Sequence, residues 1–144
     1  DVLRGHKCRL LLTPHPKEFS RLCGAPVADV LRNGVELAFR FASEYNCTVL
    51  LKGCTSIITD GKRICFNAEG TPALAKGGSG DVLSGIAAAV AARGADAFET
   101  ACAASFLLGR AGRLAEERVG CADSVIASDV VAALASAIIS LKEE

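Results

Sequence analysis

Methionine and tryptophan are absent from the 144 residues of this chain, and aromatic side chains make up only 5% of it. The hydrophobic fraction of 51% therefore consists mainly of small and aliphatic residues. Such a composition favours a layered α/β fold over an all-β fold. Because the chain begins with Asp1 and has neither a methionine nor a signal-like apolar N-terminus, it is predicted to be a piece, or a processed form, of a longer product.

Net charge is also lacking, because 16 basic and 16 acidic side chains cancel. This balance predicts no nucleic-acid partner and no binding to an anionic membrane surface, although a local phosphate site remains open. Uncharged apolar runs such as residues 86–92 are far shorter than the roughly 20 residues that a membrane helix needs. We therefore expect a cytoplasmic protein that does not span a membrane.

Paired metal-ligand or disulfide spacings are missing as well. The seven cysteines are odd in number and show no Cys-x-x-Cys spacing, and the two histidines are isolated from each other. This pattern argues against a disulfide framework and against a zinc site, so we expect reduced, mostly buried thiols and no metal-ligating side chains. The cysteines are Cys8, Cys23, Cys47, Cys54, Cys65, Cys102 and Cys121.

Apolar periodicity predicts strands that alternate with helices, which indicates a mainly parallel α/β sheet. The expected strands are residues 8–12, 48–51, 55–59 and 63–66, the last two forming a hairpin across Asp60-Gly61. Pro26 is expected as a first helical residue, Asn33-Gly34 as a weak point within its helix, and Ser128 as the cap of the final helix. The expected helices are residues 17–22, 26–46, 82–93, 98–119 and the segment that follows Ser128.

The run Gly77-Gly78-Ser79-Gly80-Asp81 is the most informative feature of the sequence. Glycines allow a tight turn and a close approach to a ligand, and the free N–H groups of the helix that follows attract an anion such as phosphate. A carboxylate beside that phosphate, from Asp81, could take a proton from a substrate hydroxyl. The alternative is a close turn between a strand and a helix, with Asp81 acting as a helix cap.

Two further segments follow predicted strands and could line the same edge of the sheet. His15 lies between two prolines, so its imidazole could be presented rigidly to a ligand, or it could simply pack against the prolines. Lys52-Gly53 and the hydroxyl residues after them could cradle nucleotide phosphates, or Lys52 could be an edge lysine beside a turn.

The residues before the glycine run leave similar alternatives open. Asn67, Glu69 and Gly70 could order a metal ion or water, or make a turn. Lys76 could add positive charge near a phosphate or be a solvated loop residue.

Together these segments resemble the ADP/ATP-dependent NAD(P)H-hydrate dehydratases, in the same order along most of the chain. The residues that carry the resemblance are Leu12-Thr13-Pro14-His15-Pro16-x-Glu18-Phe19, Leu50-Leu51-Lys52-Gly53-x-Thr55, Asn67-x-x-Gly70-x-Pro72-x-x-Ala75-x-Gly77-Gly78-Ser79-Gly80-Asp81-Val82-Leu83-x-Gly85 and Ala127-Ser128-Asp129.

The resemblance implies a ribokinase-like fold, with a layered, mainly parallel sheet flanked by helices. Residues 1–144 would form one partial domain, incomplete at its N-terminus, because family members carry further strands and helices before the Leu-Thr-Pro-His-Pro segment. A sheet cut there would expose an apolar strand edge and half a pocket.

The implied activity is metabolite repair by a lyase. ADP or ATP, with Mg²⁺ bridging its phosphates, phosphorylates the hydroxyl of hydrated NADH or NADPH, NAD(P)HX, and elimination of phosphate restores NAD(P)H. The implied partners are these small molecules, an NAD(P)HX epimerase and further copies of the chain in a homo-oligomer.

The resemblance also implies roles for individual residues. Asp81 would be the catalytic base and a substrate contact, and His15 would contact the hydrated cofactor. Gly78, Ser79 and Gly80 would supply catalytic N–H groups to the transferred phosphoryl group. The nucleotide contacts would be Lys52, Gly53, Cys54, Thr55, Ser56 and Gly80.

The chain departs from the family pattern at three places. Lys17 stands where the family usually has Gly, Lys76 where it often has Thr, and residues 69–74 where Thr-Gly-Asn-Pro-Gly-Met is common. These differences bear on fine geometry and nucleotide preference. Two other functions stay open: a ribokinase-like kinase of a small alcohol such as a vitamin precursor, and an inactive nucleotide-binding fragment.

Overall fold

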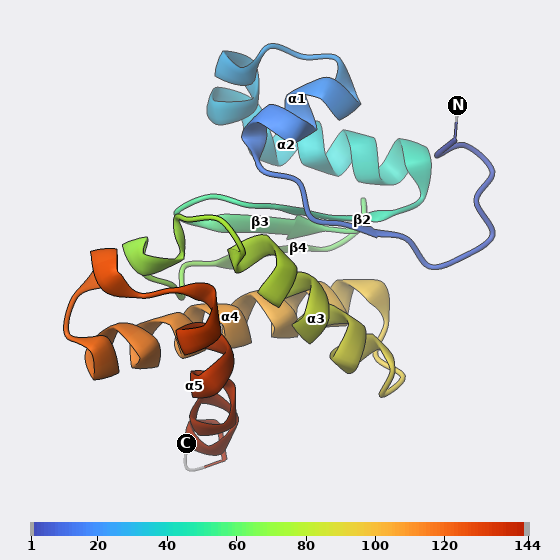
Figure 1. Cartoon of the computed structure of the whole chain (residues 1–144). Helices are drawn as coiled ribbons and strands as arrows, with labels where there is room; N and C mark the ends of the chain where they lie inside the picture. The colour runs from blue at the N-terminus through green and yellow to red at the C-terminus, as the bar shows by residue number, and fades with distance from the viewer. Residues whose placement is uncertain (1, 143–144) are drawn as a thin grey trace. The chain divides into compact units, whose positions relative to one another are not determined.

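The computed structural model of the chain describes residues 2–142 and divides into two compact units (Figure 1). Unit 1 comprises the residues up to Ala68 together with Gly94–Cys102, and unit 2 comprises Glu69–Arg93 together with the residues from Ala103 onward. Helix α4 (Ala97–Val119) therefore contributes its first turns to unit 1 and the remainder to unit 2.

Unit 1 contains a four-stranded sheet in the order β1-β2-β3-β4. Strand β1 pairs with β2 in parallel, whereas the β2–β3 and β3–β4 pairs are antiparallel. The prediction of a mainly parallel sheet is thus wrong for these strands, because two short connections return the chain through consecutive hairpins. The strands are β1 (Leu11–Leu12), β2 (Thr48–Leu51), β3 (Ser56–Thr59) and β4 (Ile64–Asn67).

The predicted hairpin across Asp60-Gly61 is confirmed. The Asp60 carboxylate accepts hydrogen bonds from the backbone N–H groups of Lys62 (2.9 Å) and Arg63 (2.7 Å), which closes the turn. Gly61 has φ +78°, and a Cβ atom there would lie 2.5 Å from the backbone nitrogen of Ser43. Only glycine therefore fits this turn.

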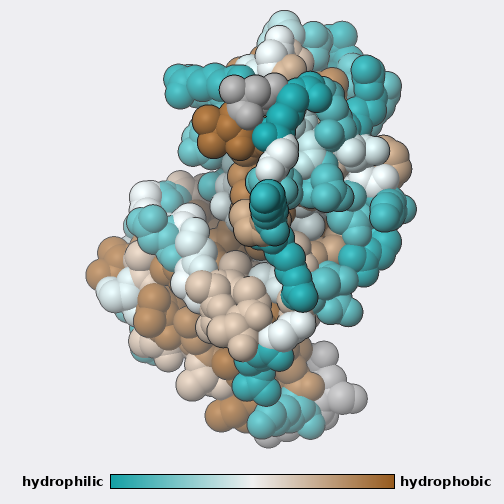
Figure 2. Space-filling view, turned by 90° about the vertical axis from the view of Figure 1, so that its right-hand side faces the viewer, coloured by the Kyte–Doolittle hydropathy of each residue, from teal (hydrophilic) through white to brown (hydrophobic). Residues whose placement is uncertain are grey.

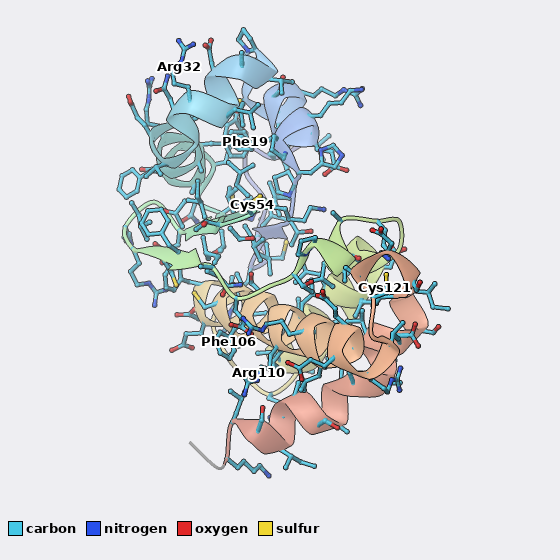
Figure 3. All side chains as sticks on the ribbon, turned by 90° about the vertical axis from the view of Figure 1, so that its left-hand side faces the viewer. Phe19, Arg32, Cys54, Phe106, Arg110 and Cys121 are labelled. Atoms are coloured by element: carbon cyan, nitrogen blue, oxygen red, sulfur yellow. The ribbon has the colours of Figure 1, made fainter. Side chains whose placement is uncertain are left out.

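Helices α1 (Pro16–Cys23) and α2 (Val27–Tyr45) pack against each other in unit 1. The ring of Phe19 is fully buried and meets Phe41 edge to face, with 5.5 Å between the ring centroids. Figure 3 shows Phe19 directed into the interior between these helices, whereas Arg32 projects outward. The core of unit 1 therefore depends on aromatic packing.

Two details of α2 bear on its predicted form. Pro26 precedes the helix as its N-cap, so the prediction that it is the first helical residue is wrong by one position. The predicted weak point is confirmed, because Asn33 has non-helical angles (φ −122°, ψ 27°). At the next position, a Cβ on Gly34 would lie 3.2 Å from the Leu51 side chain, so the missing side chain lets β2 approach closely.

Unit 2 is helical and has a core of small residues. Its buried cluster contains Ala73, Ala111, Ala115, Ala133 and Ala137 together with two valines. Glycines bring a loop close to α4, because a Cβ on Gly109 would lie 2.2 Å from the Glu69 carbonyl oxygen. The elements besides α4 are η1 (Pro72–Leu74), α3 (Ser79–Ala91), η2 (Ala122–Ser124) and α5 (Ala127–Ser140).

Helix α5 begins differently from the prediction. Its N-cap is Ile126, and the Asp129 carboxylate accepts a hydrogen bond from the Ile126 N–H at 3.0 Å, so the prediction that Ser128 caps the helix is wrong. Further along, α5 exposes the aliphatic side chains of Val131, Ile138 and Ile139. Figure 2 shows hydrophobic surface where the helices of unit 2 lie, in the lower half of the view.

Within residues 2–142, none of the helices combines the length and the apolar character needed to cross a membrane. All seven cysteines are free thiols, but only Cys47 is buried, so the prediction that most of them are buried is wrong.

Candidate functional site

The glycine run of unit 2 forms the start of α3. Gly78 is the N-cap in the left-handed region (φ 90°, ψ −22°), and its carbonyl oxygen accepts hydrogen bonds from the N–H groups of Asp81 and Val82, each at 3.1 Å. The helix begins at Ser79, three residues before the predicted start. Ser79, Gly80 and Asp81 therefore make up the first helical turn, where N–H groups point out of the helix.

Gly78 is required at this position for two reasons. Its positive φ strains any other residue, and a Cβ there would lie 3.0 Å from the Cβ of Ala127, the first residue of α5. The glycine run and the Ala127-Ser128-Asp129 segment, far apart in the sequence, thus meet in unit 2. Neither the contact nor its tightness was predicted from the sequence.

Asp81 is exposed in the first turn of α3. In the described part of the chain, no side chain accepts a hydrogen bond from this helix start, so the alternative role of Asp81 as a helix cap is wrong. The turn therefore combines uncapped backbone donors with a free carboxylate. Such a turn can bind an anion through the positive end of the helix dipole while the carboxylate accepts a proton from a neighbouring group.

Lys76 holds the loop that leads into this turn. Its ammonium group donates hydrogen bonds to the carbonyl oxygens of Ala122 (3.1 Å), the first residue of η2, and of Val125, the residue that follows η2. The interpretation of Lys76 as a solvated loop residue is therefore wrong, whereas its interpretation as positive charge near a phosphate stays a prediction. Thr71 fixes the other end of the loop, because its hydroxyl accepts from the Ala73 N–H (3.2 Å) and donates to Glu116.

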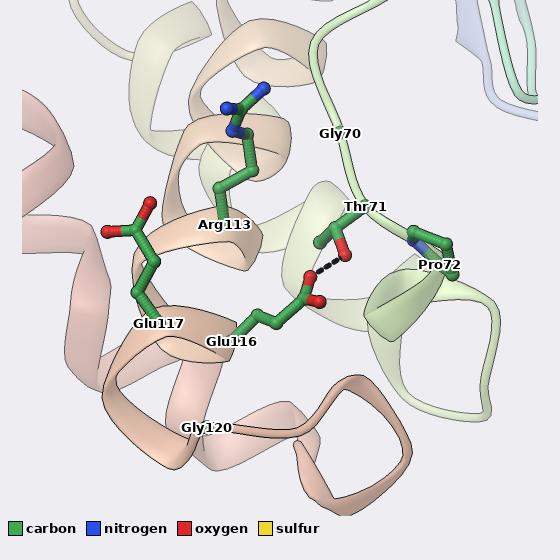
Figure 4. Close-up of a pocket in the computed structure, with 7 residues that line it drawn as sticks. All are labelled: Gly70, Thr71, Pro72, Arg113, Glu116, Glu117 and Gly120. Atoms are coloured by element: carbon green, nitrogen blue, oxygen red, sulfur yellow. Dashed lines mark hydrogen bonds between the residues drawn. The ribbon is translucent and has the colours of Figure 1, made fainter.

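A pocket of about 480 Å³ lies between this loop and α4 in unit 2 (Figure 4). The Thr71–Glu116 hydrogen bond crosses it, and the nearby Arg113 guanidinium lies 3.7 Å from the Glu69 carboxylate. Asp81 and Gly78 are not among its lining residues, so this pocket is distinct from the turn that carries the predicted base. Its lining residues are Gly70, Thr71, Pro72, Arg113, Glu116, Glu117 and Gly120.

The predicted substrate and nucleotide contacts of unit 1 follow β1 and β2. His15 is the N-cap of α1, and its imidazole Nδ1 accepts a hydrogen bond from the Glu18 N–H at 3.2 Å. In return, the Glu18 carboxylate accepts from the His15 N–H at 2.7 Å. This reciprocal capping box starts α1 at Pro16, one residue before the predicted helix, and fixes the histidine to the helix.

Lys52 lies next to this cap. Its backbone N–H donates to the Pro14 carbonyl oxygen (2.9 Å), and its ammonium Nζ lies 3.9 Å from Glu18 Oε2. Gly53, Cys54 and Thr55 are exposed beyond the end of β2, where Figure 3 labels Cys54. Ser56, the first residue of β3, is half-buried. Unit 1 therefore brings His15 and Lys52 together, both in contact with Glu18.

Sequence reasoning assigned no role to Glu18, which contacts both His15 and Lys52. The hydrogen bond from the His15 N–H lowers the pKa of Glu18 from its ordinary value of 4.5; burial opposes this effect, and the charges of Lys52, His15 and Arg21 add smaller lowering contributions. The signal was available, because His15 and Glu18 have the Ser/Thr-x-x-Glu spacing of a capping box with histidine in the first position.

In residues 2–142, no three His, Cys, Asp or Glu side chains gather into a metal site. A Mg²⁺ ion that travels with nucleotide phosphates needs only one or two protein carboxylates, and the exposed Asp81 offers one of them.

Comparisons with known proteins agree with these features. The family model described as NAD(P)H-hydrate dehydratase matches residues 2–135. An ADP-dependent (S)-NAD(P)H-hydrate dehydratase of Cenarchaeum symbiosum is 45% identical over 119 residues, which cover 82% of this chain and 40% of that protein. A bifunctional NAD(P)H-hydrate repair enzyme of Archaeoglobus fulgidus is 39% identical over 135 residues, which cover 94% of this chain and 26% of that protein.

Solved structures extend the comparison to the fold. The ADP/ATP-dependent NAD(P)H-hydrate dehydratase from Bacillus subtilis, co-crystallised with ATP and Mg²⁺, matches with a TM-score of 0.85 at 28% identity. That match covers 92% of this chain and 48% of the B. subtilis chain. A ribokinase-like superfamily protein from Enterococcus faecalis matches with a TM-score of 0.73 at 27% identity, over 86% of this chain and 42% of that one. The chain thus has a ribokinase-like α/β fold and spans half or less of the length of these relatives.

Proposed function

The chain belongs to the NAD(P)H-hydrate dehydratase family, and on that premise we propose that it takes part in the nucleotide-dependent dehydration of NAD(P)HX to NAD(P)H. One observation carries the proposal: Asp81 is exposed on an uncapped helix turn whose geometry requires Gly78. A carboxylate beside backbone anion donors is what transfer of a phosphoryl group to a substrate hydroxyl needs.

The proposed chemistry has two steps. Asp81 accepts the proton of the ring hydroxyl as its oxygen attacks the terminal phosphorus of ADP or ATP, and the bond from that phosphorus to the rest of the nucleotide breaks. The carbon–oxygen bond then breaks and inorganic phosphate leaves with the oxygen, while the neighbouring ring carbon loses a proton and the ring double bond of NAD(P)H forms. Hydroxide leaves poorly at neutral pH and phosphate leaves readily, so consumption of the nucleotide drives the elimination.

The backbone of the turn serves the first step. The N–H groups of Ser79 and Gly80 point out of the first turn, and Gly78 brings the backbone close to the transferred group, whose charge they would stabilise. Mg²⁺ bound with the nucleotide would neutralise charge on its phosphates. Gly80 would also contact the nucleotide.

The residues of unit 1 would bind the two substrates. His15 would contact the hydrated cofactor, and the Lys52 ammonium would contact the nucleotide. The residues after Lys52 would add nucleotide contacts from their backbone and hydroxyl groups; these residues are Gly53, Cys54, Thr55 and Ser56.

We also propose a cytoplasmic location, a homo-oligomer and an NAD(P)HX epimerase as a functional partner. The bifunctional repair enzymes among the relatives support a second activity in the same process.

The test is recovery of NADH absorbance from NADHX with Mg²⁺ and either ADP or ATP. We expect recovery that requires a nucleotide, and Asp81→Asn should lower its rate by about 10²- to 10⁴-fold with nucleotide binding retained. Asp29→Asn is the matched control, because Asp29 also lies in the first turn of a helix, α2. A stable phosphorylated alcohol would indicate a kinase, and nucleotide binding with no product would indicate an inactive fragment.

A further inference from the structure

Glu18 is the meeting point of three contacts in unit 1. Its carboxylate accepts from the His15 backbone N–H at 2.7 Å and lies 3.4 Å from the imidazole Nε2 and 3.9 Å from the Lys52 ammonium. Its side chain is about half exposed, as is that of His15. The carboxylate therefore touches both the residue assigned to the hydrated cofactor and the residue assigned to the nucleotide.

These contacts determine how the imidazole is presented. Because Nδ1 accepts a hydrogen bond from the Glu18 N–H, it carries no proton, and the proton of the neutral ring is on Nε2. The Nε2 atom lies 3.4 Å from the Glu18 carboxylate, whose negative charge favours a proton on that nitrogen. Both ring nitrogens thus lie near residue 18, and the faces of the ring remain for contact with a ligand.

Lys52 is held in the same arrangement by a second, independent bond. Its backbone N–H donates to the Pro14 carbonyl oxygen at 2.9 Å, which fixes the end of β2 to the residue before His15. The Glu18 carboxylate then limits where the flexible lysine side chain can place its charge. A movement of Glu18 would therefore disturb both binding residues together.

We propose that Glu18 is a positioning residue that fixes the orientation of the His15 imidazole and the reach of the Lys52 ammonium. This inference rests on the proposed function, in which those two residues bind the substrates. Glu18 acts through its neighbours and does not itself touch the reacting atoms.

The first test does not depend on activity. In protein labelled with ¹⁵N-histidine, at a pH where the imidazole is neutral, His15 should show distinct shifts for a bare Nδ1 and a protonated Nε2. In Glu18→Gln the amide can still accept from the His15 N–H, and the residue 18 backbone N–H can still donate to Nδ1, but the charge beside Nε2 is lost. The two shifts should therefore move part of the way toward the averaged values of a solvated histidine. Averaged shifts already present in the wild type would overturn the proposal.

Glu36→Gln is the matched control. Glu36 is an exposed glutamate that pairs with Arg40 of the same helix at 3.8 Å and touches neither His15 nor Lys52. It should leave the His15 shifts and the kinetics unchanged. An equal change in both variants would show a general effect of lost charge and would contradict a role particular to Glu18.

The second test uses turnover. Glu18→Gln should raise KM for NADHX on the order of tenfold, because misplacement of a binding group weakens substrate contact, while kcat stays near the wild-type value. In a protein that already carries His15→Ala, Glu18→Gln should raise KM by a smaller factor than it does in the wild type. The reason is that part of its effect acts through the imidazole, which is then absent. Full additivity, with unchanged His15 shifts, would overturn the proposal.

The two proposals fail in different ways. If the wild type does not convert NADHX with either nucleotide, the proposed function fails, and the histidine shifts alone decide whether Glu18 orders His15. If the wild type is active and Glu18→Gln matches it in KM and in the histidine shifts, only the role of Glu18 is overturned.

Discussion

The two units of the chain prepare their functional groups in opposite ways. In unit 2 the turn proposed to bind an anion is made of backbone, and its shape depends on a missing side chain at Gly78. In unit 1 the groups proposed to bind the substrates are side chains, and the Glu18 carboxylate contacts them. A turn made of backbone tolerates little added side-chain volume, whereas the side chains of a cluster can be substituted one at a time.

The cores differ in the same sense. Unit 1 relies on large rings, with Phe41 packed against Phe19 and stacked on Tyr45 at 4.4 Å between centroids. Unit 2 relies on alanines and on glycines in α4 that admit the loop before α3. Removal of volume should therefore damage unit 1 most, and addition of volume should damage unit 2 most.

The largest effect is expected from removal of the Phe19 ring. Because Phe19 is fully buried, Phe19→Ala should lower the free energy of unfolding by about 3–5 kcal/mol, measured by urea denaturation. Phe66→Ala is the control, since Phe66 is 58% exposed on the edge strand β4 and should change stability by less than about 1 kcal/mol. Amide exchange should quicken first in α1 and α2; a uniform rise over both units would contradict the contrast between them.

An added methyl group in unit 2 should have the next largest effect. Gly109→Ala would place a Cβ 2.2 Å from the Glu69 carbonyl oxygen, so it should cost about 3 kcal/mol of stability and loosen the loop at residues 69–76. Gly85→Ala in α3 meets nothing within 4 Å and should instead stabilise the chain, by about 0.5 kcal/mol or more. Equal losses in the two variants would mean that the close approach at Gly109 is not important.

The smallest effect concerns pH. The pKa of Glu18 is lowered by the His15 N–H, so its stabilising contribution is fully present above its ordinary value of 4.5 and is lost as the pH falls below that value. The thermal midpoint of the wild type should therefore approach that of Glu18→Gln as the pH is lowered from 7 to about 3. A difference that stays constant over this range would show that the carboxylate charge does not stabilise α1.

Much of the fold could be predicted because its signals are local. Asp60-Gly61 predicted the hairpin, and Asn33 marked the irregular turn of α2. The first residues of helices were harder to predict, because they depend on which side chain accepts a hydrogen bond from the backbone N–H groups at the helix start. At the start of α5 that side chain is Asp129 and not Ser128.

The candidate site was predicted in its parts but not in its contacts. The glycine run predicted a phosphate-binding helix start, and the uncapped turn of α3 fits that expectation. The roles of Lys76 and Glu18 depend on groups that only folding brings near, such as the carbonyl oxygens beside η2. No spacing in the sequence indicates that Ala127 lies against Gly78.

The order of the strands has a kinetic consequence. Strands β2, β3 and β4 are consecutive antiparallel neighbours, so they can pair through short hairpins, whereas β1 pairs with β2 only across the whole of α1 and α2. Closing that long loop for a two-residue strand is slow relative to hairpin formation. We therefore expect a refolding chain to form the strand that leads to Lys52 before β1 docks beside it, so that His15 reaches its final place last.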